Sequence, residues 1–424
     1  MQLERESIVC PGCACLCDDL DLVMEDHRPV AVHNVCAWGT GKFLGEKKLH
    51  HHKERRRLTE PQIQRQGGWE SVSYEAALEE AASLLAKARR PVIYGLTNSG
   101  SWTQRAALVL ARSLRARLEP ADLAFMAPYY QALQKYGLFW ATLETLRDEA
   151  DAVIYWGANP LHSCPRQLVR YAVFARGRFT ERGIEDRQVA AVDLYRTEMA
   201  HFCHFFVQIE PDKELPLVEV LIAAVKGGLQ PESLPSPAKK LTEFLARATY
   251  GVIFCGRGVS YRSGQNLFDR LGELAACLNQ TRPFVLFPMS GDFNAAGLYH
   301  LLLTETGSPF APDFAASSPL GCHAVPVDFQ EVDALLVSGA DLFWFLKEEQ
   351  AQDLIRRQVP IVALSPFADR TTARARVLLP VALDGIETPE IAHRMDGLPV
   401  FLRPVAPAPA PPAHQVLADL NLFF

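Results

Sequence analysis

Five of the ten cysteines in this 424-residue chain lie within its first 36 residues. Four of them follow the spacing C-x2-C-x3-C-x18-C, namely Cys10, Cys13, Cys17 and Cys36. A tight loop with three thiolates, joined by a fourth thiolate from a neighbouring element, is what a zinc ion or an iron–sulfur cluster requires of the backbone. The sequence therefore predicts a metal centre, and the spacing alone does not decide between iron–sulfur and zinc.

Two other interpretations of these thiols remain open. A disulfide framework would need an oxidising compartment, yet the chain opens with Met-Gln-Leu-Glu-Arg-Glu and shows no apolar signal region. The thiols could also be packing or vestigial cysteines that hold no metal. We expect a cytoplasmic protein, with the metal centre as the first interpretation.

The bulk composition limits the classes of partner. A net charge of −6 and a pI of about 6.1 give no global attraction to nucleic acid or to acidic membranes. The longest apolar runs, such as residues 284–288, are strand-sized and far short of the roughly 20 residues of a membrane span. We therefore expect neither a nucleic-acid partner nor a membrane, and the length predicts two or three domains.

The elements that must position the metal centre follow a regular alternation of strands and helices. Residues 91–95 form an apolar run that ends in glycine, and a polar loop and an amphipathic helix through residues 107–118 follow. Helical periodicity also predicts a helix over 73–88 with Ser73 as its N-cap. Further strands are predicted at 152–156, 189–192, 252–256, 284–287, 334–338 and 361–364. This alternation indicates parallel sheets buried on both faces, with ligands at the carboxyl ends of the strands.

Two of the predicted strands share a sequence pattern. Residues 151–158, Asp-Ala-Val-Ile-Tyr-Trp-Gly-Ala, match residues 333–340, Asp-Ala-Leu-Leu-Val-Ser-Gly-Ala, in strand, glycine and spacing. Two similar α/β lobes would produce this echo, and coincidence would explain it equally well because many strands end in this way.

Two segments lie outside the alternation. Residues 47–57 are basic and rich in histidine, which is typical of a solvated linker or of a contact with an acidic partner or anionic ligand. Residues 404–412 are rich in proline, and such a semi-rigid polyproline stretch cannot build a core. We expect the second segment to lie on a surface.

The ordered set of motifs resembles the molybdopterin oxidoreductases, and within them the B subunit of formylmethanofuran dehydrogenase. The four cysteines with Gly39-x-Gly41-Lys42-Phe43 resemble that family's [4Fe–4S] module. The other motifs are Trp156-Gly-Ala-Asn-Pro160 with Pro165-Arg166, Val192-Asp-Leu-Tyr-Arg-Thr-Glu198, Gly291-Asp-Phe-Asn-Ala-Ala-Gly297, Thr306-Gly-Ser-Pro-Phe-Ala-Pro-Asp-Phe314, Gly385-Ile-Glu387 and His393-Arg-Met-Asp-Gly-Leu-Pro399. Any one of them is weak, whereas the ordered set is specific and spans almost the whole chain.

The resemblance implies an α/β fold of the formate dehydrogenase/DMSO reductase type. Domains I to III would be present as parallel sheets flanked by helices with a small N-terminal cysteine-rich β module, and the C-terminal β-barrel domain would be absent. The implied division is a cysteine-rich module at 1–57, a discontinuous first α/β domain at 58–120 plus 251–403, a second α/β domain at 121–250, and a Pro-rich tail at 404–424.

The resemblance also implies a cofactor site. In the family a lysine at the position of Lys42 lies between cluster and pterin, and a bis-pterin guanine dinucleotide carries tungsten or molybdenum. The matching cofactor positions here are Gly157, Asn159, Pro160, Asp193 and Arg196. Backbone amides at a strand end can meet a phosphate, and an aspartate there can accept hydrogen bonds from guanine or ribose. The competing interpretation is that Gly157, Asn159 and Pro160 only make the turn.

Two departures from the family pattern bear on activity. Phe125 and Met126 stand where the family has its metal-ligating cysteine or selenocysteine and the histidine after it. Phenylalanine offers no lone pair to a metal, and methionine has no proton to relay. Leu194 and Tyr195 replace a Pro-Arg-like pair, although Arg196 follows. We expect that the molybdenum or tungsten pterin has been lost and that the chain holds no catalytic residue.

The sequence therefore favours a structural B subunit of a bacterial formyltransferase/hydrolase complex in tetrahydromethanopterin-linked oxidation of formaldehyde to formate. The resemblance implies A-, C- and D-type subunits as partners, which bind the methanofuran-type carrier and carry out formyl transfer and hydrolysis. One alternative is an active molybdenum or tungsten formylmethanofuran dehydrogenase subunit with a [4Fe–4S] cluster. Another is a module in which the N-terminal metal site alone carries function.

Overall fold

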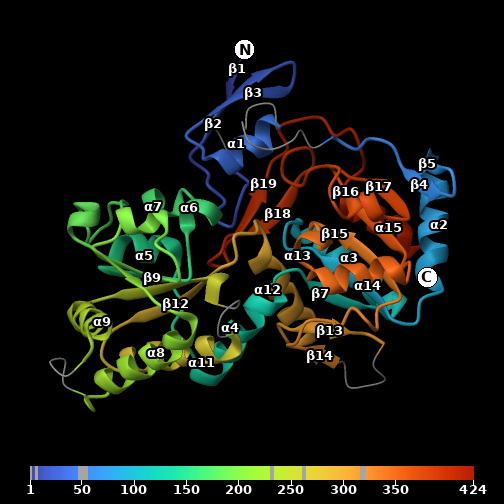
Figure 1. Ribbon diagram of the computed structural model, residues 1–424. Coiled ribbons are helices and arrows are strands. Elements are labelled where there is room, and N and C mark those ends of the chain that lie inside the picture. Colours follow the sequence, from blue (N-terminus) through green and yellow to red (C-terminus); the bar gives the residue numbers. More distant parts are fainter. Residues whose placement is uncertain (1, 5–7, 46–55, 230–233, 260–263, 316–320) are drawn as a thin grey trace. The chain divides into compact units, whose positions relative to one another are not determined.

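The computed structural model describes residues 2–4, 8–45, 56–229, 234–259, 264–315 and 321–424 (Figure 1). The chain forms two compact units: a first unit, Met1–Leu123 with Asp292–Phe424, and a second unit, Ala124–Gly291. The basic segment at 47–57 lies almost entirely outside the described residues. Within the described ranges, no helix is both long enough and apolar enough to cross a bilayer.

The second unit is built on a five-stranded parallel sheet with the order β10-β9-β8-β11-β12. Its strands are β8 (Ala152–Trp156), β9 (Gln188–Asp193), β10 (Phe205–Gln208), β11 (Gly251–Gly256) and β12 (Phe284–Met289). Its helices are α4 (Leu123–Tyr136), α5 (Leu143–Glu149), α6 (Pro160–Ser163), α7 (Gln167–Arg170), η2 (Gly183–Glu185), η3 (Glu198–His201), α8 (Pro211–Val225), α9 (Ser236–Arg247) and α11 (Gly264–Leu278). Every residue of β8, β11 and β12 is buried, as expected of strands covered on both faces.

The first unit is built on a nine-stranded mixed sheet with the order β14-β13-β7-β6-β15-β16-β17-β4-β5. The parallel strands are β6 (Pro91–Gly95), β7 (Arg117–Pro120), β15 (Ala334–Ser338), β16 (Ile361–Ser365) and β17 (Val377–Pro380). The antiparallel edges are β4 (Gln62–Arg65), β5 (Gly68–Ser71), β13 (Ala311–Asp313) and β14 (Gly321–His323). The chain is thus a mixed α/β protein with parallel sheets at its centre.

Helices cover both faces of the nine-stranded sheet. They are α2 (Tyr74–Ala86), α3 (Ser101–Leu114), α12 (Ala295–Thr306), α13 (Leu342–Phe345), α14 (Glu348–Arg356), η5 (Thr372–Arg374) and α15 (Ala413–Asn421). Successive strand residues point to opposite faces, so Ile93 and Leu336 join one apolar cluster while Val92 and Leu335 join another. This double burial explains why the strands read as near-continuous apolar runs.

The structure confirms the predicted strands and the helix predicted over residues 73–88. Strands β6, β8, β9, β11, β12, β15 and β16 coincide with the predicted runs to within two residues at either end. The Ser73 hydroxyl accepts a hydrogen bond from the Ala76 N–H at 3.2 Å and caps α2. The predicted helix through residue 118 was too long: α3 ends at Leu114 because Arg115 adopts a left-handed conformation with φ of 53°, and Leu118 lies in β7.

The division of the chain differs from the predicted one at two places. Residues 251–291 were assigned to the first α/β domain, but β11 pairs with β8 and places this segment in the second unit. The predicted tail at residues 404–424 is ordered, and in its proline-rich part, 404–412, Pro404 and residues 407–409 are exposed whereas Val405 is buried. The residues that follow form α15, which packs along α3 and buries Val416, Leu417 and Leu420 in the core.

The sequence echo corresponds to a repeated local structure. Asp151 precedes β8 and accepts hydrogen bonds from the N–H groups of Thr249 and Tyr250, which lead into its neighbour β11. Asp333 precedes β15 and accepts from the N–H groups of Arg89 and Arg90, which lead into its neighbour β6. The glycine after each strand has positive φ, 54° at Gly157 and 67° at Gly339. These shared features favour two similar lobes over coincidence.

The N-terminal part of the first unit is a small β module. It contains β1 (Gln2–Glu4), β2 (Asp21–Glu25) and β3 (Arg28–His33) in one antiparallel sheet, followed by α1 (Ala37–Leu44). A separate hairpin of β18 (Glu390–His393) and β19 (Pro399–Leu402) belongs to the same unit.

A buried carboxyl pair, formed by Glu390 of this hairpin and Asp384 before it, contacts the start of α3. Glu390 is 0% exposed and accepts hydrogen bonds from the N–H groups of Trp102 and Thr103 at 3.0 and 3.1 Å. Asp384 accepts from the Gly100 N–H at 2.7 Å. These donors are the N-terminal N–H groups of α3, which have no partners within the helix. A Cβ atom on Gly100 would lie 2.1 Å from the Glu390 Cδ atom, so only glycine fits there.

This pair makes stability depend on pH. Burial, and next the charge of Glu390, raise the pKa of Asp384 to about 7. The folded chain therefore keeps a proton that the unfolded chain releases above about pH 4, and the free energy of unfolding falls as pH rises toward 7. We expect Asp384→Asn to remove this part of the pH dependence. Between pH 5 and 7.5 the free energy of unfolding of the wild type should fall by more than about 1 kcal/mol relative to that of the variant. Urea unfolding at a series of pH values measures it, and equal slopes in both proteins would contradict the assignment.

Candidate metal centre and cofactor-binding loops

The first three predicted thiols lie on one closed loop of the first unit. The Cys10 N–H donates to the Cys17 carbonyl at 2.8 Å, and the Leu16 N–H donates to the Cys13 carbonyl at 3.2 Å. Leu16 has a φ of 41°, which turns the chain tightly between the second and third ligands. Cys10, Cys13 and Cys17 are all buried.

The fourth thiol stands at the start of a helix. Cys36 is the N-cap of α1, and the backbone N–H groups of Gly39 and Trp38 in the first turn of the helix point toward the side of its thiol without forming a side-chain cap hydrogen bond. Burial raises the pKa of Cys36, while these N–H groups lower it. Donors of this kind stabilise a thiolate and are common around metal-bound sulfur.

The other predicted ligands act electrostatically on the Cys10 thiol. Burial raises the pKa of Cys10 most, and the charges of Cys13, Cys17 and Cys36 raise it further. Cys10, Cys13 and Cys17 are buried and Cys36 is half-buried, and thiolates that repel one another fit a bound cation, because metal binding removes both the protons and the repulsion. Four thiols are a donor set that either a zinc ion or an iron–sulfur cluster takes. Cys15 is also buried and is not among the groups that raise the pKa of Cys10, although its Sγ atom lies within 4.8 Å of the Cys13 Sγ atom.

Two glycines leave room for the Cys10 sulfur. A Cβ atom on Gly12 would lie 3.1 Å from the Cys10 Sγ atom, and one on Gly39 would lie 2.7 Å from it. Any side chain at Gly39 would also meet the Val35 Cγ2 atom at 2.3 Å. The loop and the start of α1 are thus packed against each other around a sulfur atom.

The β18–β19 hairpin holds the cysteine loop in place. The Met395 N–H, at the tip of the hairpin, donates to the Ala14 carbonyl at 2.8 Å. An apolar cluster joins the two segments: Val9, Leu16, Phe293, Ala392 and Leu402. Lys42, the residue that the resemblance places between cluster and pterin, extends from α1 with its Nζ atom 5.8 Å from the centre of the Phe293 ring.

The predicted cofactor positions of the second unit meet at the carboxyl edge of its sheet. Gly157 follows β8, and its N–H donates to the Val192 carbonyl at 2.9 Å. Asn159 caps α6, and Pro160 is the first residue of that helix. The side-chain oxygen of Asn159 accepts a hydrogen bond from the Leu161 N–H at 3.2 Å, and the side-chain nitrogen of Asn159 donates one to Glu198 at 2.8 Å. These bonds suffice to make the turn, as the competing interpretation requires.

Asp193 and Arg196 follow the neighbouring strand. Asp193 ends β9, is largely buried and accepts a hydrogen bond from the Leu194 N–H at 2.7 Å. The Arg196 guanidinium lies over the Phe206 ring at 5.9 Å, and Tyr195 is exposed. Gly157, Asn159, Pro160, Asp193 and Arg196 thus lie on two loops of one sheet edge, whereas Lys42 belongs to the first unit.

Phe125 and Met126 lie inside α4 and are buried. The Phe125 side chain is 2% exposed, and its ring contacts Phe268 of α11 edge to face at a centroid distance of 5.5 Å. Tyr129, one helical turn further on, contacts the same ring at 6.4 Å. Phe125 is thus part of an aromatic cluster with Tyr129 and Phe268.

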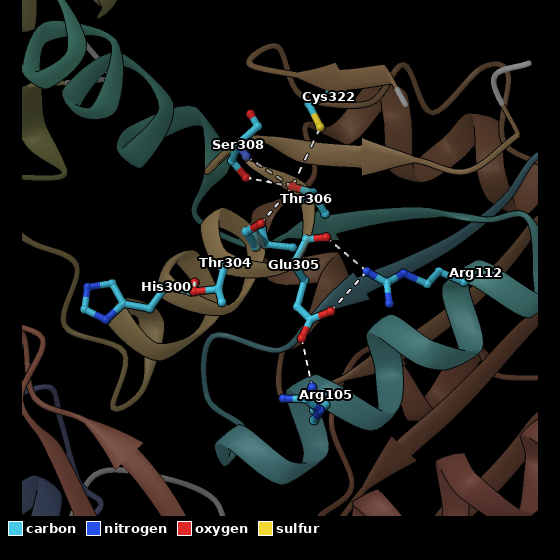
Figure 2. Close-up of polar contacts among 9 residues, drawn as sticks. Arg105, Arg112, His300, Thr304, Glu305, Thr306, Ser308 and Cys322 are labelled. Atoms are coloured by element: carbon cyan, nitrogen blue, oxygen red, sulfur yellow. Dashed lines mark hydrogen bonds and ion pairs between the residues drawn. The ribbon is translucent and has the colours of Figure 1, made fainter. Parts of the chain in front are cut away.

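The motif at residues 306–314 has a structural basis that Figure 2 shows. The Thr306 hydroxyl donates to the Leu302 carbonyl at 2.7 Å and accepts from the Ser308 N–H at 3.3 Å and the Cys322 thiol at 3.9 Å. Glu305 forms ion pairs with Arg105 and Arg112 of α3. These contacts end α12 and attach it to α3.

The sequence did not reveal the carboxyl pair of Asp384 and Glu390 or the contact between Met395 and Ala14. In the sequence, Gly385-Ile-Glu387 and residues 393–399 stand out only as family motifs. Their partners, Gly100 and Ala14, lie hundreds of residues earlier, and no local pattern indicates such a pairing.

The comparisons identify the class of protein. The molybdopterin oxidoreductase family model matches residues 57–410, and the chain belongs to that family. Within it, the chain groups with the B subunits of formylmethanofuran dehydrogenases. The B subunit of the tungsten-containing formylmethanofuran dehydrogenase 2 of Methanocaldococcus jannaschii is 33% identical over 416 residues, 95% of this chain and 94% of that protein. The Methanococcus maripaludis protein of the same name is 31% identical with the same coverage.

Solved structures with the same fold include two enzymes. A chain of the formyltransferase/hydrolase complex FhcABCD of Methylorubrum extorquens, solved with methylofuran, has a TM-score of 0.67 at 20% identity, covering 85% of this chain and 97% of that one. Acetylene hydratase of Pelobacter acetylenicus has a TM-score of 0.63 at 12% identity, covering 98% of this chain and 70% of that one. At these identities the likeness defines the fold.

We predict that the metal content depends on four of the five N-terminal cysteines. Cys10→Ser and Cys36→Ser should each lose most of the bound metal, because removing one of four thiolates opens the coordination shell. Cys15→Ser is the matched control and should retain it. Elemental analysis of the purified protein measures the loss, and absorbance that bleaches with dithionite distinguishes iron–sulfur from zinc. Full metal content in Cys36→Ser, or loss in Cys15→Ser, would contradict the ligand set.

Proposed function

We propose that this chain is the B-type subunit of a formylmethanofuran dehydrogenase-like formyltransferase/hydrolase complex, and that it is a structural subunit without redox chemistry. The complex transfers a formyl group from tetrahydromethanopterin to a methanofuran-type carrier and hydrolyses it to formate. Both reactions belong to partner subunits of the A, C and D types, and the location is cytoplasmic. The family membership and the shared fold of the FhcABCD chain support this proposal.

The observation that carries the proposal is the environment of Phe125. A phenyl ring has no donor atom for tungsten or molybdenum, and this ring is buried against Phe268 instead of facing a ligand. Met126, beside it, is also buried and has no proton to relay. A chain with these two residues at the reactive position would keep the fold and lose the oxidoreduction.

The loops at the carboxyl edge of β8 and β9 are consistent with this loss. The side-chain amide of Asn159 forms hydrogen bonds with Leu161 and Glu198, and the Asp193 carboxylate accepts a hydrogen bond from the Leu194 N–H in its own loop. Arg196, which a phosphate would need, lies on the Phe206 ring. These loops hold their own polar groups in place, so the turn remains ordered when no pterin is bound.

The cysteine site would then serve as a structural cross-link within the N-terminal module. A zinc ion or [4Fe–4S] cluster, when bound, cross-links the thiolates of Cys10, Cys13, Cys17 and Cys36. This cross-link joins the loop at residues 10–17 to α1, and the β18–β19 hairpin fixes the loop to the rest of the first unit. The site thus has a structural use even where no electron acceptor follows.

A second candidate function is an active tungsten or molybdenum formylmethanofuran dehydrogenase subunit with a [4Fe–4S] cluster. One observation favours it: the two curated relatives, at 33% and 31% identity, are tungsten-containing enzymes. It would require a metal ligand other than residue 125, and Lys42 would then lie on the path of the electron.

Metal and pterin analysis distinguishes the two functions. The complex purified through this chain should contain less than about a tenth of a tungsten or molybdenum atom per chain and no pterin after acid release, because position 125 offers no ligand. It should still catalyse formyl transfer and hydrolysis through its other subunits. Stoichiometric tungsten or molybdenum together with pterin would overturn the structural assignment in favour of the active dehydrogenase.

Substitution at position 125 tests whether this side chain now serves packing. Phe125→Ala should lower the free energy of unfolding of the chain by about 3 to 5 kcal/mol, the usual cost of removing a buried phenyl ring. Phe139→Ala, at an exposed phenylalanine of the same unit, is the matched control and should change it by less than about 0.5 kcal/mol. Hydrolysis per assembled complex should be equal in both variants, and a specific loss of turnover in Phe125→Ala would argue against a purely structural role.

A further inference from the structure

Two histidine side chains of the first unit meet where α12 contacts the β18–β19 hairpin. His300 lies on α12, and His393 is the last residue of β18. Their ring centres are 5.4 Å apart, with an angle of 74° between the ring planes. The His300 side chain is exposed and the His393 side chain is half-buried, so solvent reaches the pair. The proposed function makes no use of this contact.

Each ring lies against the backbone of the other element. A Cβ atom on Gly397, in the turn of the hairpin, would lie 2.6 Å from the His300 Cε1 atom and 3.1 Å from its Nε2 atom. A Cβ atom on Gly297 of α12 would lie 2.8 Å from the His393 Nδ1 atom. Figure 2 shows the His300 ring pointing away from the polar contacts that end α12. The Nε2 edge of His300 therefore faces the hairpin, and the Nδ1 atom of His393 faces α12.

Hydrogen bonds hold one nitrogen of this pair and leave the others available. The His393 Nδ1 atom lies 3.4 Å from the Ser101 Oγ atom, which accepts a hydrogen bond from the Asn294 side chain at 3.3 Å. The tautomer that donates its Nδ1–H to this hydroxyl carries its lone pair on Nε2, and most metal-bound histidines have such an outer hydrogen bond. Within the described ranges, neither the His393 Nε2 atom nor either ring nitrogen of His300 has a hydrogen-bond partner or an ion pair.

The spacing of the two rings suits a shared metal ion. A tetrahedral ion that binds two imidazole nitrogens at about 2.0 to 2.1 Å holds the ring centres about 5 Å apart. The observed distance of 5.4 Å reaches this value through small side-chain rotations. Imidazole nitrogens are good ligands for zinc, copper and nickel ions. An edge-to-face ring contact without an ion has a similar spacing, so saturable metal binding is the property that distinguishes the two.

We propose that His300 and His393 bind a divalent transition-metal ion of the zinc or nickel type through imidazole nitrogens, with water in the remaining positions. The ion connects α12 to the β18–β19 hairpin, which contacts the cysteine loop through Met395. The donor set differs from that of the cysteine centre, because imidazoles are harder ligands than thiolates. The site goes beyond the proposed function and is independent of it.

Titration of the full-length chain with nickel chloride tests this site. The parent chain has a filled cysteine centre, and alanine replaces His50, His51 and His52 so that this histidine run does not bind the probe. Calorimetry at about pH 7.5 should show one saturable site per chain. His300→Gln and His393→Gln should each weaken nickel binding about tenfold or more, because a single imidazole cannot chelate the ion. The double variant should bind no more weakly than either single variant.

A third histidine of the same unit provides the matched control. His323 is exposed, and its Nε2 atom lies 3.9 Å from an Asp313 carboxylate oxygen. His323→Gln should change the nickel affinity by less than about twofold. Nickel should also slow amide hydrogen exchange in β18 of the parent chain but not of His300→Gln, because the ion joins the hairpin to α12. Thermal unfolding without nickel should be equal in these two proteins, since the His300 ring is exposed.

Three results would overturn the proposal. The first is an absence of saturable nickel binding to the parent chain, which would leave a ring contact only. The second is equal nickel affinity in the parent chain and His300→Gln, and the third is a loss of affinity in His323→Gln as large as in His300→Gln. None of these results bears on the proposed function, which the tungsten, molybdenum and pterin analysis tests separately.

Discussion

The buried carboxyl group of Glu390 is the constraint on which the described part of the first unit depends. A carboxyl group without solvent contact is tolerated only where donors replace water, and the first turn of α3 supplies them. Glu390 also begins β18, so the same contact fixes the β18–β19 hairpin beside the sheet. The hairpin then holds the cysteine loop through Met395. The order of the cysteine loop therefore depends on a contact that involves no thiol.

The elements that the sequence predicts are those with local causes. The run at Pro91–Gly95 is apolar because both of its faces are buried, and Ser73 caps α2 within three residues of itself. Partners far apart in the chain are a different matter. The sequence of residues 251–256 predicts a strand but is compatible with either unit. Only the pairing of this strand with β8 shows that it belongs to the second unit. The helix α15 follows a proline-rich stretch that suggested a tail, and its burial against α3 appears only in three dimensions.

The candidate site divides in the same way. The spacing of Cys10, Cys13 and Cys17 predicts a closed loop, because three ligands so close in sequence leave few conformations. The contact with Met395 that supports the loop has no local signature. At position 125 the resemblance predicts that the family's metal ligand is missing, while the aromatic cluster around Phe268 is visible only in the fold. Acidic residues such as Asp384 usually lie on the surface, so the residue type gives no reason to expect that the Asp384 side chain is buried.

The hydrogen bond between Ala14 and Met395 can form only late in the synthesis of the chain, because Met395 is made long after Ala14. A ribosome releases the cysteine loop first and the hairpin that supports it only after most of the other residues, a delay on the order of tens of seconds at ordinary rates of synthesis. Throughout that interval the thiols have no hairpin to pack against and remain open to solvent, to oxidants and to any delivery protein. For the proposed metal centre, the period in which a metal is most easily inserted is therefore the period in which its ligands are most easily damaged.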